Sequence, residues 1–142
     1  MAGRYSFEYW GVHKGIPLYY TSPAAAAQIK TDAEFAGFKA LLDPLQTKPW
    51  IWLFDCRGMK TEHYLNIHFV KKMAYTIEHD HAQSLQVVWV LNMDSWLRRM
   101  ASLFGRKKVV PLPTDRLELL VQMQQEGCPE DVIDRMLVAI RR

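Results

Sequence analysis

The chain has 142 residues, of which 49% are apolar and 23% charged, and its formal net charge at pH 7 is +3. This length and composition predict one soluble domain, spanning residues 1–142, with a single sizeable core. Two cysteines far apart in the sequence exclude a disulfide framework and a zinc pattern, and no segment approaches the roughly 18 apolar residues that span a bilayer. The mild charge argues against nucleic-acid binding. We therefore expect a cytoplasmic protein without a bound metal or cofactor.

The first elements that we expect are two strands joined as a hairpin. Residues 5–10 alternate aromatic and polar side chains, which is typical of a strand with one exposed face. Residues 13–15 suit a turn, and residues 16–20 supply the second strand. Because Pro17 has no backbone N–H, this strand should lie near an edge of the sheet or pair on one side only at that point.

Two helix signals follow the hairpin. A Ser-Pro pair suits a helix start and predicts a short helix at about 23–29. Thr31 and Glu34 have the spacing of a capping box, which predicts a longer helix at about 32–42.

The middle of the chain predicts a β-α-β unit. Trp50–Phe54 and Val87–Leu91 are apolar runs with the length of buried strands, and they end at the polar residues Asp55 and Asn92. Helical periodicity covers residues 62–79 between them. We therefore expect two adjacent, parallel strands joined by a right-handed crossover.

The last third of the chain continues the alternation of helices and strands. We expect a helix at 95–104, a short strand at 108–112, a helix from Thr114 or Asp115 to Gly127, and a last helix from Pro129. The complete order is β-β-α-β-α-β-α-β-α-α. It predicts an α/β fold with a mixed, mostly parallel five-stranded sheet and helices packed mainly on one face.

Taken in order, several motifs resemble those of the CRAL-TRIO lipid-binding family. The family has an apolar strand that ends in Asp-x-x-Gly, a second strand that ends in Asn, a strand that begins with Lys, and a Leu-rich helix. The matching segments here are Trp52–Met59, Val87–Trp96, Lys108–Leu112 and Leu117–Leu120, with Phe69–Lys72 on the first crossover helix and Gly11–Tyr20 at the family's opening hairpin. The resemblance covers most of the chain and implies the fold of that family.

The resemblance also implies a lipid-binding module. In the phosphatidylinositol-binding branch, the Lys at the start of the strand contacts the lipid headgroup, and Lys108 occupies that position. We expect no counterpart of the helical subdomain that precedes the fold in the family. The connection from Asn92 to Lys108 is also short, so the helix that gates the lipid cavity is reduced. We therefore expect a reduced form of the domain.

The same layout without a gate resembles the STAS (anti-sigma-factor antagonist) domains, which are interaction modules. The Ser that is phosphorylated in those domains is missing here. A domain of this kind would bind a protein partner or form a homodimer and would have no lipid cavity. The lipid-binding interpretation instead gives a phospholipid or an anionic membrane surface as the partner, and it implies peripheral attachment to membranes.

Two sets of residues are candidates for lipid binding. Five cations within eleven residues alternate with apolar side chains, as in segments that lie on anionic membranes: Arg98, Arg99, Arg106, Lys107 and Lys108. The candidates for lining an acyl-chain cavity are aromatic: Trp52, Phe54, Trp89 and Trp96. A solvated helix face and an ordinary core are the simpler interpretations of these two sets. Alternation along the strand places Trp50, Trp52 and Phe54 on one face of the sheet.

No group of residues in the sequence indicates catalysis or metal binding. Asp55 and Asn92 follow strands, where the sites of open α/β sheets occur, but no His or nucleophile accompanies them. The segment His79–His81 carries metal-ligating groups, yet side chains two residues apart do not share a helix face. Cys56 suits a small buried residue. We therefore predict that the protein is not an enzyme.

Overall fold

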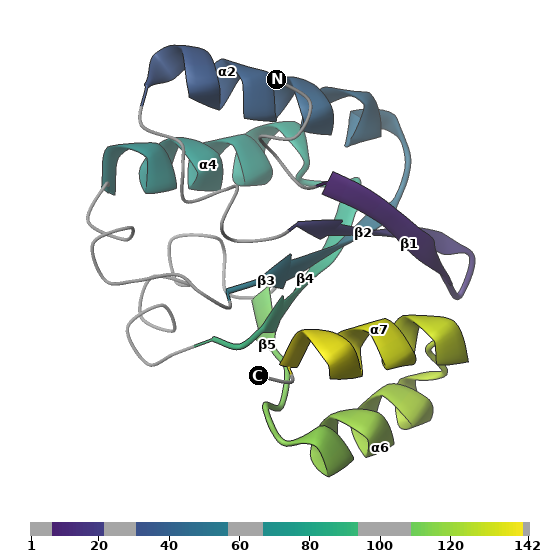
Figure 1. The fold of residues 1–142 in the computed structure, drawn as a ribbon. Coiled ribbons are helices and arrows are strands. Elements are labelled where there is room, and N and C mark those ends of the chain that lie inside the picture. The colour runs from purple at the N-terminus through teal and green to yellow at the C-terminus, as the bar shows by residue number, and fades with distance from the viewer. Residues whose placement is uncertain (1–6, 22–30, 57–66, 94–108, 141–142) are drawn as a thin grey trace.

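A computed structural model describes residues 7–21, 31–56, 67–93 and 109–140 of the chain. Figure 1 shows a central sheet between two layers of helices. The described elements, in chain order, are β1 (Phe7–His13), β2 (Ile16–Thr21), α2 (Asp32–Leu42), the 3-10 helix η2 (Asp43–Thr47), β3 (Trp50–Asp55), α4 (Ile67–Asp80), β4 (Leu85–Leu91), β5 (Val109–Pro111), α6 (Arg116–Glu126) and α7 (Glu130–Ile140). The helices predicted at 23–29 and 95–104 lie outside the described residues.

The described strands form one mixed sheet in the order β1-β2-β3-β4-β5. β1 runs antiparallel to β2, and the other three neighbouring pairs are parallel. The predicted mixed, mostly parallel five-stranded sheet is therefore confirmed. The parallel pairing of the two apolar runs is confirmed as well, because the register runs from Ile51 opposite Val87 to Asp55 opposite Leu91.

The hairpin shows how the sheet accommodates Pro17. Lys14 and Gly15 connect β1 to β2 with φ angles of 53° and 81°, the positive values that two-residue hairpin turns require. Pro17 pairs with Val12 of β1, whereas the pairing of β2 with β3 begins at Leu18. The predicted one-sided pairing at Pro17 is therefore confirmed, and the ladder with β3 starts one residue beyond the missing N–H.

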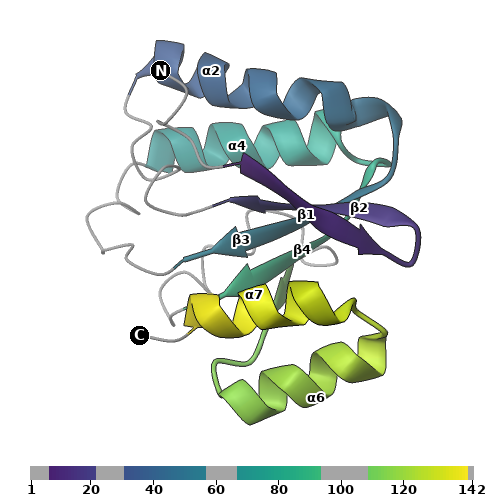
Figure 2. The ribbon, with the colours of Figure 1, turned by 45° about the vertical axis from the view of Figure 1, so that its right-hand side comes forward.

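The helices cover both faces of the sheet, which corrects the prediction that they pack mainly on one face. α2 and α4 lie side by side over one face, and α6 and α7 cover the other (Figures 1 and 2). Right-handed crossovers between strands that follow one another across a sheet place their helices on the same face, which accounts for α2 and α4. α6 and α7 follow β5, the last strand of the described sheet, and pack against the opposite face.

Each face of the sheet has its own hydrophobic core. The core under α2 and α4, called the α2–α4 core, includes the buried residues Phe35, Phe38, Leu42, Trp50, Trp52 and Ile77. The core under α6 and α7, called the α6–α7 core, includes Ile51, Leu53, Trp89, Leu119, Met123 and Met136. The alternation predicted along β3 is therefore confirmed, since its Trp side chains face one core and Ile51 and Leu53 face the other.

Local capping interactions set the helix ends as the sequence predicts. The Thr31 hydroxyl accepts a hydrogen bond from the Glu34 N–H, and the Glu34 carboxylate accepts one from the Thr31 N–H, each at 3.1 Å. This is the predicted capping box of α2. Asp115 caps the start of α6, and Gly127 follows its last residue with a left-handed φ of 80°.

We expect Gly127→Ala to lower the free energy of unfolding by about 1 kcal/mol. A Cβ at this position would meet Lys14 Cε at 3.9 Å, an ordinary contact, so the cost comes from the left-handed backbone. Urea unfolding followed by tryptophan fluorescence measures the change. Gln125→Ala, on the exposed surface of α6, is the control and should alter stability much less. An unfolding midpoint for Gly127→Ala equal to that of the wild type would contradict this account.

Candidate functional site

Three polar side chains meet where β2, β3 and β4 end, at the carboxyl-terminal edge of the parallel strands. Asp55 is the last residue of β3 and has no exposed surface. Its Oδ2 accepts a hydrogen bond from the Tyr20 hydroxyl at 2.7 Å. Its Oδ1 accepts a hydrogen bond from Asn92 Nδ2 at 2.9 Å. We call Tyr20, Asp55 and Asn92 the Asp55 cluster.

Asn92 connects the Asp55 cluster to α7. Its φ of 58° is left-handed, a conformation that Asn adopts more readily than most residues. From this position Asn92 Nδ2 donates a second hydrogen bond, 3.2 Å long, to the carbonyl oxygen of Ala139 near the end of α7. The cluster therefore holds together the ends of three strands and of one helix.

The geometry of the Asp55 cluster suits an anchor better than an acid–base site. Both carboxylate oxygens of Asp55 accept hydrogen bonds, and a side chain without exposed surface is out of reach of a substrate. The sequence pointed to Asp55 and Asn92 but not to Tyr20. Tyr20 lies near the end of the predicted second strand, but its contact with Asp55 depends on that strand lying next to β3, which the sequence alone does not show.

The aromatic residues that were candidates for lining one cavity lie on different faces of the sheet. Trp52 and Phe54 pack in the α2–α4 core, whereas Trp89 is buried in the α6–α7 core. Trp89 pairs with Leu53 of β3, and residues paired across neighbouring strands point to the same face. Trp89 therefore cannot line a cavity together with Trp52 and Phe54, which corrects that grouping. Trp96 lies outside the described residues.

The basic candidates for headgroup and membrane contact also lie outside the described residues. They are Arg98, Arg99, Arg106, Lys107 and Lys108, the last of which directly precedes β5 in the sequence. Their role stays a prediction.

The side chains of the segment His79–His81 diverge. His79 lies on the exposed side of α4 and stacks on Tyr75, with ring centroids 4.6 Å apart. His81 is buried beside Trp50, with ring centroids 5.4 Å apart. Across the part of the chain that the structure describes, no group of three metal-ligating residues forms.

Both cysteines are buried and do not form a disulfide. Burial raises the pKa of the Cys128 thiol to about 11, with smaller contributions from the negative charges of Asp131 and Glu126. This thiol is therefore protonated at neutral pH and is a poor nucleophile. Cys56 packs in the α2–α4 core as a small apolar side chain.

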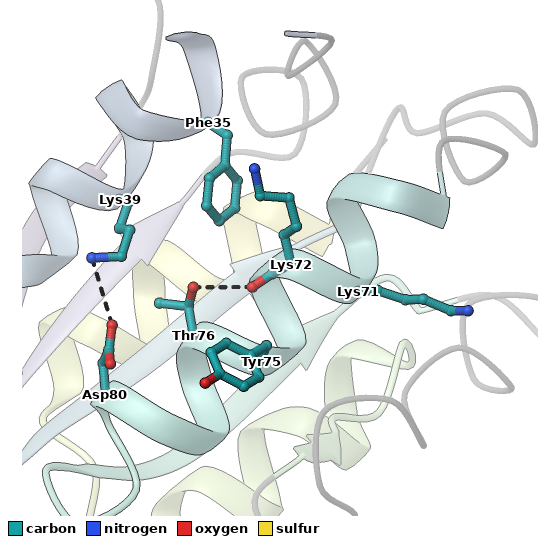
Figure 3. A pocket seen from close by; sticks show the side chains of 7 residues that line it. All are labelled: Phe35, Lys39, Lys71, Lys72, Tyr75, Thr76 and Asp80. Atoms are coloured by element: carbon teal, nitrogen blue, oxygen red, sulfur yellow. Dashed lines mark hydrogen bonds and ion pairs between the residues drawn. The ribbon is translucent and has the colours of Figure 1, made fainter. Parts of the chain in front are cut away.

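A groove between α2 and α4 was not anticipated from the sequence. It has a volume of about 430 Å³ and is lined by Phe35, Lys39, Lys71, Lys72, Tyr75, Thr76 and Asp80 (Figure 3). The sequence feature that could have indicated the groove is the four-residue spacing of Lys72, Thr76 and Asp80, which places these residues on one side of α4.

Two of the lysines that line this groove form ion pairs between α2 and α4. Lys39 Nζ lies 3.5 Å from Asp80 Oδ2, and Lys72 Nζ lies 3.1 Å from Asp32 Oδ1. Lys72 also lies over the ring of Phe35, 4.7 Å from its centroid. Figure 3 shows Lys71 pointing away from the other side chains. Because the inward-pointing lysines already pair with aspartates, the groove has little charge left to attract an anion.

None of the described helices combines the length and the hydrophobicity needed to cross a bilayer. The fold and the site define an α/β domain with an open, mostly parallel sheet, covered on both faces and anchored at its strand ends by a buried carboxylate. A family model described as a divergent CRAL/TRIO domain matches residues 32–113, from α2 through β5, which is more than half of the chain. The chain therefore belongs to the CRAL-TRIO family.

Family membership confirms the resemblance found in the sequence and gives the general class of the protein. CRAL-TRIO domains are in general lipid-binding modules. A search among curated proteins finds no match to this sequence.

Proposed function

We propose that this domain is a non-catalytic module that binds a phospholipid or an anionic membrane surface. The observation that carries the proposal is the family match over residues 32–113. The order and direction of β2, β3, β4 and β5 agree with it. The absence of catalysis is supported by the burial of Asp55, whose partners in the Asp55 cluster hold it away from solvent.

For the binding site we propose the basic segment that ends at Lys108. Lys108 would contact the headgroup, with Arg106 and Lys107 nearby, while Arg98 and Arg99 would touch the membrane surface. Cations near an anionic leaflet are attracted by its negative surface potential, which supports this assignment. Binding of this kind would attach the domain to membranes peripherally.

A second candidate function is a protein-interaction module of the STAS kind, including a homodimer. Two observations favour it. Side chains of both helix layers fill both faces of the described sheet. In addition, α6 exposes Leu117 and Val121, which are 68% and 43% exposed and lie one turn apart. An exposed apolar pair on a helix is a feature that a protein partner could cover.

Native mass spectrometry after gentle purification distinguishes the two functions. We expect the protein to carry a bound phospholipid, which appears as a discrete mass increment and is released when the protein is denatured. The physical reason is that a lipid held by a folded domain dissociates slowly enough to survive purification. A homodimer without any lipid would contradict the proposal and favour the interaction module.

A further inference from the structure

His13 is the last residue of β1, and its side chain is buried next to the α6–α7 core. Its side chain is 5% exposed, and its ring centroid lies 5.2 Å from that of Trp89 on β4. Among the described residues, Nδ1 of His13 has no hydrogen-bond partner. A buried ring in this setting tolerates its neutral form far better than a cation.

The hairpin that carries His13 also packs against α7 and against the turn before it. Gly11 approaches so closely that a Cβ there would lie 3.3 Å from Val132 Cγ2. The Arg135 guanidinium lies over the ring of Trp10, 5.5 Å from its centroid. Lys14 Cε lies 3.9 Å from the position of a Cβ on Gly127. The hairpin therefore helps to hold α7 and the α6–α7 turn against the sheet.

We propose that His13 is an acid-sensitive latch: when its ring takes up a proton, the β1–β2 hairpin separates from Trp89 and from the α6–α7 turn. The neutral ring carries one N–H, and uptake of a second proton converts it into a cation with two. The Nδ1–H and the positive charge then have no described partner in the core. Opening of the hairpin lets water solvate that cation. The latch is closed at neutral pH and opens in acid.

The charges around His13 favour the same direction. Burial lowers the pKa of His13 below its ordinary value of 6.5, the positive charge of Lys14 lowers it further, and the negative charge of Glu126 partly opposes both. Trp89 of β4 carries no charge. Cys128, in the turn after α6, stays neutral because its pKa is about 11. Since the ring has the lower pKa in the closed state, the open state binds more protons, and closure weakens as the pH falls below about 6.5.

Hydrogen–deuterium exchange of the intact protein between pH 7.5 and pH 5 tests the latch, after correction for the intrinsic pH dependence of amide exchange. We expect the opening equilibrium of the amides in residues 11–18 and 127–133 to rise by up to about tenfold per pH unit below 6.5, because one proton is taken up on opening. The amides of α4 should respond less and serve as the internal reference.

His13→Gln should abolish the pH dependence in these two segments, because its side chain is polar and does not titrate. His79→Gln, on the exposed side of α4, is the matched control and should leave the dependence unchanged. If His13→Gln kept the wild-type pH dependence, the proposal would be wrong. An NMR titration of the wild type checks the latch without any variant: a His13 pKa at or above 6.5 would also overturn it.

Discussion

Asp55→Ala should lower the free energy of unfolding by about 3 kcal/mol, because it removes the acceptor of two hydrogen bonds at once. The Tyr20 hydroxyl would lose this partner at a buried site and the Asn92 amide at a half-buried one. Asn92 would then hold α7 less firmly through Ala139. Urea unfolding monitored by circular dichroism measures the loss.

Three further variants separate the contributions to this effect. Tyr20→Phe removes one donor and should cost about 1 to 2 kcal/mol. A double-mutant cycle of Tyr20→Phe with Asp55→Ala should give less than additive losses, because both changes delete the same hydrogen bond. Asp43→Ala, which removes an exposed carboxylate paired with Lys39, should cost about 0.5 kcal/mol or less. If Asp55→Ala were as mild as Asp43→Ala, the Asp55 cluster would not be an anchor.

The strands and most helix ends could be predicted because their signals are local. Trp50–Phe54 and Val87–Leu91 are continuous apolar runs, and Thr31 forms its capping box with a residue only three positions away. The placement of α6 and α7 could not be predicted in this way. Their amphipathic patterns show that each buries one face, but not which face of the sheet they bury it against. That choice depends on the path of the chain after β5.

The candidate site was partly predictable for a similar reason. Asp55 and Asn92 follow apolar runs, so the sequence alone places them at strand ends. Their contact with Tyr20 depends on β2 lying next to β3, which only the sheet order reveals. The grouping of Trp89 with Trp52 failed because it required the register between β3 and β4. Within one strand alternation fixes the face of a residue, but between strands a shift by one position reverses it.

Replacing Arg98, Arg99, Arg106, Lys107 and Lys108 together with Gln should weaken binding to anionic liposomes by several kcal/mol at low ionic strength, and by at most about 5 kcal/mol. Each cation near an anionic bilayer contributes roughly 1 kcal/mol, so the five contributions add to this upper limit. The attraction should fall as salt is added, because the Debye length shortens to about 8 Å at 0.15 M. Sedimentation with vesicles of phosphatidylcholine, with and without phosphoinositide, measures the bound fraction.

A matched pair of variants distinguishes a specific site from general positive charge. Arg106→Gln, Lys107→Gln and Lys108→Gln together remove three charges from the proposed headgroup site. Lys14→Gln, Lys48→Gln and Lys71→Gln remove three charges from exposed positions elsewhere. Only the first triple variant should lose most of the binding. Equal losses would show that net charge, and not the segment ending at Lys108, drives attachment. If the wild type did not sediment with phosphoinositide vesicles even at low salt, the membrane function would be wrong and the interaction module would take its place.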